Sequence, residues 1–165
     1  MTLPFQDLLK RYRTKGVLID ANLLLLFAVG TANVEFIKEF KRTSMFDADA
    51  YYLLREILAK FTVRYVTPNI MTEVSNFAGE LWGERKLLVF AVIRETFSVL
   101  QEQYVPTGQA VHEREFPIYG LTDTTIIVLL KNDLLFLTTD GPLAGHCANL
   151  GINAINFTPL YFQTS

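Results

Sequence analysis

The sequence predicts an α/β fold, a three-layer α/β/α sandwich with a central parallel sheet. Short apolar runs rich in β-branched residues, which are typical of strands buried on both faces, alternate along the chain with segments of helical length. Strands that alternate with helices build a parallel sheet with helices on both faces. No internal repeat, low-complexity segment or linker interrupts the alternation, so we expect one domain over residues 1–165.

In the first third of the chain, one strand is followed by three helices. The strand is expected at 16–20 and the first helix at 22–28, broken by Gly30. A second helix is expected at 33–42. The third, 47–61, places its apolar residues on one face with a 3.6-residue period: Tyr51, Leu54, Ile57, Leu58 and Phe61.

The middle third predicts one strand and two longer helices. The strand 63–66 precedes a helix over 67–79, where a threonine can cap the helix and a proline occupies its first position. A long helix, 84–103, contains the apolar run 87–93 and is expected to be largely buried. Residues 104–117 contain two prolines and a glycine, and they are expected to form an irregular connection.

The last third returns to strict alternation. A helix at 124–131, again beside a threonine cap, is followed by a strand at 134–138. A helix at 143–150 ends before Gly151, and a final strand is expected at 152–157. These two strands complete the predicted parallel sheet.

The composition is that of a chain with a real core and no membrane span. Half of the 165 residues are hydrophobic and only 19% are charged, which excludes a disordered chain. The longest apolar runs, 23–29 and 87–93, are far shorter than the roughly 20 residues that cross a bilayer. Because the mean hydropathy of +0.25 is high, we expect the surplus apolar surface to cover a subunit or partner interface.

Charge and cysteine content bound the location and the partners. The first residues lack the basic-then-apolar order of a signal peptide, and Cys147 is the sole cysteine, so we expect a cytoplasmic protein without disulfides or a cysteine-based zinc site. The net charge of −2 and the pI near 5.7 are not the bulk signature of a nucleic-acid-binding protein. Residues 1–15 form a basic segment before the first strand, interpreted as a solvated helix face.

Four carboxylates stand at equivalent places, where strands end or helices begin: Asp20, Glu73, Asp123 and Asp140. These places meet at the carboxyl edge of a parallel sheet, where ligands bind in open α/β folds. Grouped hard oxygen ligands suit Mg²⁺ or Mn²⁺, ions that generate hydroxide from water and stabilise charge on a phosphodiester. Each acid also has a structural interpretation as a helix cap, a first-turn residue or a solvated side chain. Asp20 is the one for which we expect the weakest structural reason.

Four segments resemble the acidic motifs of PIN-domain ribonucleases, in the family's order and at plausible spacing. They are Val17-Leu18-Ile19-Asp20-Ala21-Asn22, Thr67-Pro68-Asn69-Ile70-Met71-Thr72-Glu73-Val74, Leu121-Thr122-Asp123-Thr124-Thr125-Ile126 and Leu137-Thr138-Thr139-Asp140-Gly141-Pro142-Leu143-Ala144. Each motif is short, and it is their succession that is specific. The resemblance covers about residues 16–157 and is weakest over 84–117. It implies a PIN-like α/β/α sandwich and divalent-metal-dependent cleavage of single-stranded or structured RNA.

The resemblance also implies roles for individual residues. By their positions in the four motifs, the acids would hold Mg²⁺ or Mn²⁺: Asp20, Glu73, Asp123 and Asp140. The bound metal would activate the attacking water. Asn22 and Thr139 match the polar positions that accompany the first and last acids, with hydrogen bonds to a carboxylate or bound water as their implied role. His112, His146 and Cys147 lie outside the motifs; we expect satisfied or surface histidines and a buried, apolar cysteine.

Many small PIN proteins are toxins of toxin–antitoxin pairs and dimerise. The resemblance therefore implies RNA as substrate, an antitoxin protein as partner and a homodimer. The competing interpretation is a non-catalytic PIN-like binding or scaffold protein. A phosphoaspartate enzyme of the haloacid-dehalogenase kind is disfavoured, because Asn22 stands where its second aspartate is needed. A response-regulator receiver domain is disfavoured too, because this sequence lacks the acidic pair and the late lysine that such a domain requires. For Trp82 we expect core packing.

Overall fold

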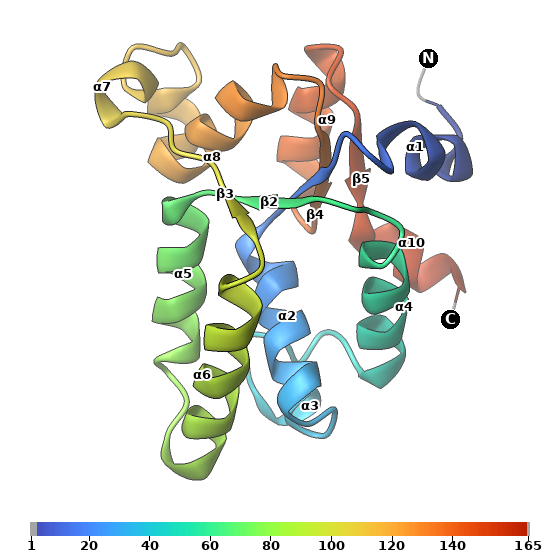
Figure 1. Ribbon diagram of the computed structural model, residues 1–165, viewed down its shortest axis with the longest axis vertical. Coiled ribbons are helices and arrows are strands. Elements are labelled where there is room, and N and C mark those ends of the chain that lie inside the picture. The colour runs from blue at the N-terminus through green and yellow to red at the C-terminus, as the bar shows by residue number, and fades with distance from the viewer. Residues whose placement is uncertain (1–2, 165) are drawn as a thin grey trace.

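The computed structural model describes residues 3–164 and confirms the expected fold class. Residues 1, 2 and 165, which the expected domain 1–165 includes, lie outside the described range. The described chain contains a five-stranded, all-parallel sheet with helices on both faces (Figure 1). Its strands are β1 (Val17–Ile19), β2 (Arg64–Val66), β3 (Gln101–Glu102), β4 (Leu135–Thr138) and β5 (Ala154–Asn156).

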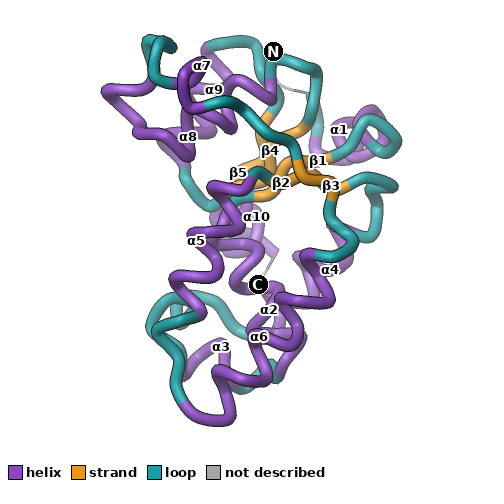
Figure 2. The backbone as a smooth tube through the Cα atoms, turned by 60° about the vertical axis from the view of Figure 1, so that its left-hand side comes forward, coloured by secondary structure: helices purple, strands orange, loops and turns teal. Residues whose placement is uncertain are grey.

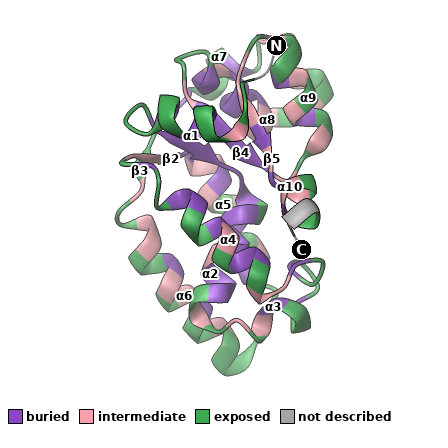
Figure 3. Cartoon of the chain, turned by 90° about the vertical axis from the view of Figure 1, so that its right-hand side faces the viewer, coloured by how far each residue is buried: buried purple, intermediate pink, exposed green. Residues whose placement is uncertain are grey.

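The strand order, β3-β2-β1-β4-β5, puts the first strand in the middle of the sheet. In register, Val17 lies opposite Arg64 of β2 and opposite Leu135 of β4. All of β1 and β4 is buried, as their continuous apolar sequences require (Figure 3). Because β1 and β4 are parallel neighbours, the residues that follow them emerge side by side at one edge.

Two sets of helices enclose the sheet (Figures 1 and 2). On one face lie α2 (Ala21–Ala32), α3 (Phe36–Glu39), α4 (Ala48–Leu58), α5 (Pro68–Ala78) and α6 (Gly83–Phe97). On the other lie α1 (Phe5–Tyr12), α7 (Thr107–Ala110), α8 (Phe116–Leu130) and α9 (Gly141–Asn149). The last helix, α10 (Phe157–Thr164), begins with the ring of Phe157 packed edge-on against Phe46. None of the described helices is long and apolar enough to cross a membrane.

Two expected boundaries in the first third are wrong. Gly30 does not break the first helix but lies inside α2, and a side chain there would collide with the ring of Tyr51 from α4. The glycine therefore permits close helix packing. The helix expected at 33–42 is only the four-residue α3, because Phe40 is already extended and the hydroxyl of Thr43 donates to the carbonyl oxygens of Ile37 and Phe40.

The expectation for 84–103 is wrong in length and in burial. Helix α6 ends at Phe97, and Gln101–Glu102 form the edge strand β3 instead. Within α6, Val89 and Ile93 are buried, whereas Leu87 is 73% exposed. The apolar side chains of residues 87–93 point to all sides of the helix, and only those on the side that faces the core are covered.

The connection expected at 104–117 contains α7 and the beginning of α8. Helix α8 starts earlier than the expected residue 124, and it is kinked at Gly120, whose φ of 79° and ψ of −177° are not helical. The positive φ is one that glycine adopts without strain. The kink separates a first turn, 116–119, from the longer segment that carries Asp123.

Candidate metal site

The four carboxylates singled out from the sequence line one pocket of about 390 Å³ at the carboxyl edge of the sheet. Two of them follow the adjacent strands β1 and β4, and two project from α5 and α8: Asp20, Asp140, Glu73 and Asp123. Asn22 also lines this pocket. Thr139 lies beside it, and the amide Nδ2 of Asn22 donates to Thr139 Oγ1 over 3.3 Å. Parallel topology thus brings together residues that are far apart in sequence.

Asp20 is the most constrained of the four. Its Oδ1 accepts the backbone N–H of Leu23 at 2.8 Å, which caps α2. Its Oδ2 accepts the hydroxyl of Thr138 at 2.6 Å and the backbone N–H of Thr139 at 2.7 Å. Burial raises the pKa of Asp20, and these hydrogen bonds oppose the rise. The expectation that Asp20 has the weakest structural reason is wrong, because it caps a helix and ties β1 to the end of β4.

Asp140 caps the helix that follows β4. Its Oδ1 accepts the N–H of Leu143 at 2.8 Å, and its own N–H donates to the hydroxyl of Thr138 at 2.9 Å. Since the same hydroxyl donates to Asp20, Thr138 sets the relative position of the two acids. Thr138 is fully buried, so this link is shielded from water.

Glu73 is held across the pocket by the other helix. The hydroxyl of Thr122 in α8 donates to Glu73 Oε1 at 2.7 Å. Thr122 follows the kink, where Thr124 Oγ1 donates to the carbonyl oxygen of Gly120 at 2.6 Å. The kink therefore places the first turn of the continuing helix, including Asp123, against α5.

Asp123 carries the strongest electrostatic signature. Burial is the largest cause that raises its pKa from 3.8 to about 6. The further causes are the negative charges of the other three carboxylates, in decreasing order Asp140, Glu73 and Asp20. Among the hydrogen bonds of residues 3–162, none is accepted by the Asp123 carboxylate, and no lysine, arginine or histidine of that range lines the pocket. The pocket is thus an uncompensated concentration of negative charge.

The donor set fits a hard divalent cation. Carboxylate oxygens are the preferred protein ligands of Mg²⁺ and Mn²⁺. Within the described range, no three or more His, Cys, Asp or Glu side chains are already gathered closely enough to hold an ion. The capping hydrogen bonds of Asp20 and Asp140 direct one carboxylate oxygen of each residue towards a helix, and so keep these oxygens from turning towards the other acids. Mg²⁺ usually keeps several waters and takes one or two carboxylates, so a closed cage is not required.

Cys147, Trp82 and the two histidines do not line the acidic pocket. Cys147 is buried, as expected; burial, and next the charge of Asp123, raise its pKa to about 11, which makes the thiol inert. Trp82 is 83% exposed, so the expectation of core packing is wrong for it. His112 is exposed, as expected, but the expectation is wrong for His146: its Nε2 is buried without a hydrogen-bond partner among the described residues, 3.5 Å from Glu115 Oε1.

Tyr119 is a pocket residue that the sequence reasoning missed. It precedes the kink in α8 and lines the acidic pocket. The glycine directly after it, followed by Leu-Thr-Asp, is the one signal that could have placed it beside Asp123. A second cavity, of about 370 Å³ and with mainly apolar walls, includes Ile19, Leu24 and Phe27. It contains none of the four acids, so it is separate from the candidate site.

Comparison of the sequence with models of protein families gives no match. A search of curated proteins gives no match either. The interpretation of the pocket therefore rests on its geometry and charge, together with the resemblance of the four motifs.

Proposed function

We propose that this protein is a divalent-metal-dependent ribonuclease that hydrolyses RNA phosphodiester bonds in the acidic pocket. The observation that carries the proposal is that four carboxylates line one pocket to which the described residues contribute no lysine, arginine or histidine; burial, and next the charges of the other three acids, raise the pKa of Asp123 to about 6. Perturbed carboxylates in a cleft are a mark of functional sites. The order of the four motifs, which resembles that of PIN-domain ribonucleases, supports the choice of reaction.

In this proposal the ligands of Mg²⁺ or Mn²⁺ are Asp20, Glu73, Asp123 and Asp140. The bound ion supplies Lewis acidity, which lowers the pKa of water and stabilises charge on the phosphodiester. The chain itself fixes the ligands: Thr138 holds the first and last acids in register, and Thr122 holds Glu73. Asn22 and Thr139, which bond to each other, support the Asp20 side of the pocket.

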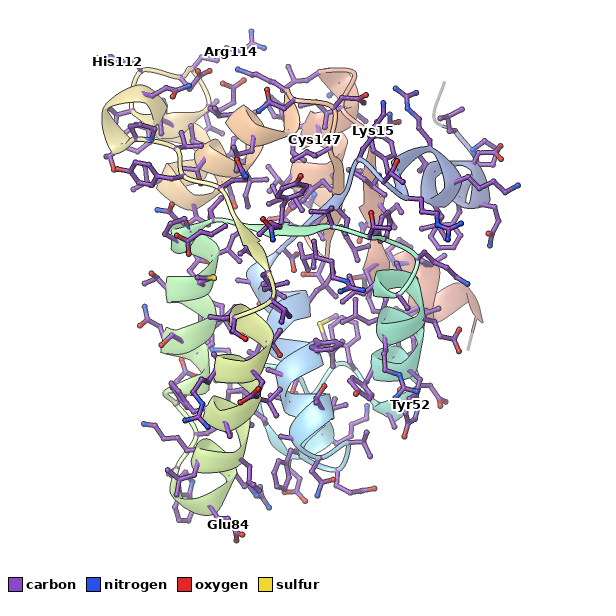
Figure 4. All side chains as sticks on the ribbon, in the orientation of Figure 1. Lys15, Tyr52, Glu84, His112, Arg114 and Cys147 are labelled. Atoms are coloured by element: carbon purple, nitrogen blue, oxygen red, sulfur yellow. The ribbon has the colours of Figure 1, made fainter. Side chains whose placement is uncertain are left out.

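A cleavage assay with matched variants tests the proposal. The purified protein is incubated with a mixed RNA pool in Mg²⁺, Mn²⁺ or EDTA, beside Asp123→Asn and Glu84→Gln. Glu84 is an exposed carboxylate in the first turn of α6 (Figure 4) and does not line the pocket, so its variant controls for the loss of one charge. We expect metal-dependent cleavage by the wild type and by Glu84→Gln, and none by Asp123→Asn. Equal cleavage by all three would remove Asp123 from the site, and cleavage in EDTA would exclude a metal-dependent reaction.

The resemblance to PIN-domain ribonucleases also supports a proposal about the cellular role and the partners of the protein. We propose a cytoplasmic toxin of a toxin–antitoxin pair, with an antitoxin protein and a second copy of the chain as partners. Trp82, Leu87 and Leu88 are exposed apolar side chains at the beginning of α6, and we propose that they contact a protein partner. Induced expression of the wild type should arrest growth, and expression of Asp123→Asn should not.

A non-catalytic scaffold is the second candidate, and a specific observation favours it. Asp20 and Asp140 have complete structural roles as helix caps, and in the described part of the chain no three potential ligands are preassembled. A scaffold has no need of metal affinity. Mn²⁺ binding that depends on Asp123 would therefore decide between the two.

A further inference from the structure

We propose that the pocket selects single-stranded RNA by stacking an unpaired nucleobase on the ring of Tyr119. The inference rests on the proposed function and narrows its substrate, since a base that is paired within a duplex cannot reach such a ring. Three features of the described residues carry it: the missing cations of the pocket, the position of Tyr119, and the groups that hold its ring.

The first feature is the absence of basic side chains around the carboxylates. Proteins usually gain nucleic-acid affinity from lysine and arginine contacts to phosphates. Within residues 3–164, no such side chain lines the acidic pocket. Arg114, from the α7–α8 connection, projects away from the molecule (Figure 4), and its Nε donates to Glu115 Oε1 at 3.0 Å. Within the pocket, contacts to the bases and a bound ion are therefore the sources of affinity for RNA that do not need a basic side chain.

The second feature is the position of Tyr119. Among the residues that line the pocket, the aromatic ones are Tyr119 and Phe136. Phe136 lies in β4 and is fully buried, so it is part of the core. Tyr119 is half-buried at the end of the turn before Gly120, and thus presents an aromatic side chain next to the acids. Stacking of a base on such a ring contributes about 1–3 kcal/mol and tolerates different sequences.

The third feature is the support behind the ring. The imidazole of His146 in α9 contacts the Tyr119 ring, with centroids 5.0 Å apart and planes tilted by 39°. His146 Nε2 lies 3.5 Å from Glu115 Oε1, and Glu115 is only 3% exposed. The histidine thus packs against the tyrosine ring and restrains it, while the histidine Nε2 has no hydrogen-bond partner among the described residues. A ring held in place loses little conformational entropy when a base stacks on it.

These features predict discrimination between single and double strands. In an A-form helix each base is stacked and paired, whereas bases in single strands and loops can be splayed onto an aromatic side chain. A substrate held partly by its base should also show weak salt dependence. Each phosphate neutralised by a protein cation would add about −0.7 to the logarithmic salt slope for a single strand, and we expect a slope near zero.

The first test uses a probe without charge, so that neither metal nor cleavage is needed. Saturation-transfer NMR with adenosine is recorded on the wild type and on Tyr119→Ala, Tyr119→Phe and Tyr52→Ala. Tyr52 is an exposed tyrosine on α4 (Figure 4) and does not line the pocket. We expect transfer with the wild type, Tyr119→Phe and Tyr52→Ala, and its loss with Tyr119→Ala. The phenylalanine variant shows that the ring, and not the hydroxyl, is what binding requires, and circular dichroism of Tyr119→Ala checks that this variant is folded. Transfer that persists in Tyr119→Ala, or its absence in the wild type, would overturn the inference.

The second test measures turnover of one RNA sequence as a single strand and as a duplex. Tyr119→Ala should lower kcat/KM on the single strand by about 5- to 150-fold, mainly through KM, as the loss of one base stack requires. The duplex should be a poor substrate for all variants. Cleavage that is unaffected by Tyr119→Ala would refute the inference and leave the ribonuclease proposal standing. Absence of cleavage by the wild type would count against the ribonuclease, while the adenosine experiment would still decide the role of Tyr119.

Discussion

Replacing Asp123 by asparagine should make the protein more stable at neutral pH, although it removes a charged group from the candidate site. Burial and three neighbouring carboxylates disfavour the ionised form of Asp123 in the folded state, which raises its pKa to about 6. The unfolded chain has no such environment, so its aspartate titrates near the ordinary value of 3.8. Asparagine keeps the shape and cannot ionise.

The sign and size of the effect follow from linkage. Between pH 4 and pH 6 the folded state binds more protons at this position than the unfolded state, so stability falls as the pH rises through this window. Above about pH 7 the penalty is complete, and the difference between 3.8 and about 6 corresponds to roughly 3 kcal/mol. Because part of the pocket is open to solvent, we take this figure as an upper bound and expect a gain of about 1–3 kcal/mol for Asp123→Asn.

Urea denaturation at a series of pH values measures this effect. The difference in unfolding free energy between Asp123→Asn and the wild type should be near zero at pH 4 and should grow to its full value at pH 7. Glu84→Gln, which removes an exposed carboxylate far from the pocket, should show no such growth. A difference that does not change with pH, or a variant less stable than the wild type at pH 7, would refute the electrostatic account. Added Mn²⁺ should stabilise the wild type more than the variant.

The remaining predictions concern residues with structural roles. Asp20→Asn should destabilise the fold by about 1–3 kcal/mol in urea denaturation, because the new amide faces two donors, the Thr138 hydroxyl and the Thr139 N–H. Asp140→Asn should change stability little, since asparagine caps helices equally well. Equal effects of the two substitutions would contradict the hydrogen-bond assignment. Gly30→Ala should lower the unfolding free energy by about 1–3 kcal/mol through collision with Tyr51, and an unchanged midpoint would show that α4 can move away. Cys147 should react with a thiol reagent only upon unfolding, and fast reaction of the native protein would contradict its burial and raised pKa.

The sheet and the acidic pocket were accessible from sequence because their signals are local. Strands such as Val17–Ile19 and Leu135–Thr138 are mainly apolar runs, and each is followed within two residues by the aspartate that caps the next helix. Parallel topology then requires those polar residues to meet. The meeting of Asp20 with Asp140 therefore follows from pattern and topology without any knowledge of side-chain packing.

What the sequence did not predict depends on contacts between distant segments. Gln101–Glu102 are both exposed and polar, so nothing in their pattern marks β3; pairing with β2 alone makes them a strand. Gly30 resembles a helix breaker until Tyr51 is seen against it. Tyr119 reaches the pocket only because of the kink at Gly120. In each case tertiary contact overrides local propensity.

A calorimetric titration with Mn²⁺ tests the central claim most directly, because it needs no knowledge of the RNA target. The folded wild type and Glu84→Gln should bind Mn²⁺ with the same affinity, and Asp123→Asn should bind at least about tenfold more weakly, a loss of about 1.4 kcal/mol. Asp123→Asn is the preferred variant because the Asp123 carboxylate accepts no hydrogen bond from residues 3–162, so its loss leaves the described framework intact. No binding by the folded wild type, or equal binding by all three proteins, would contradict a metal site in this pocket and favour the scaffold.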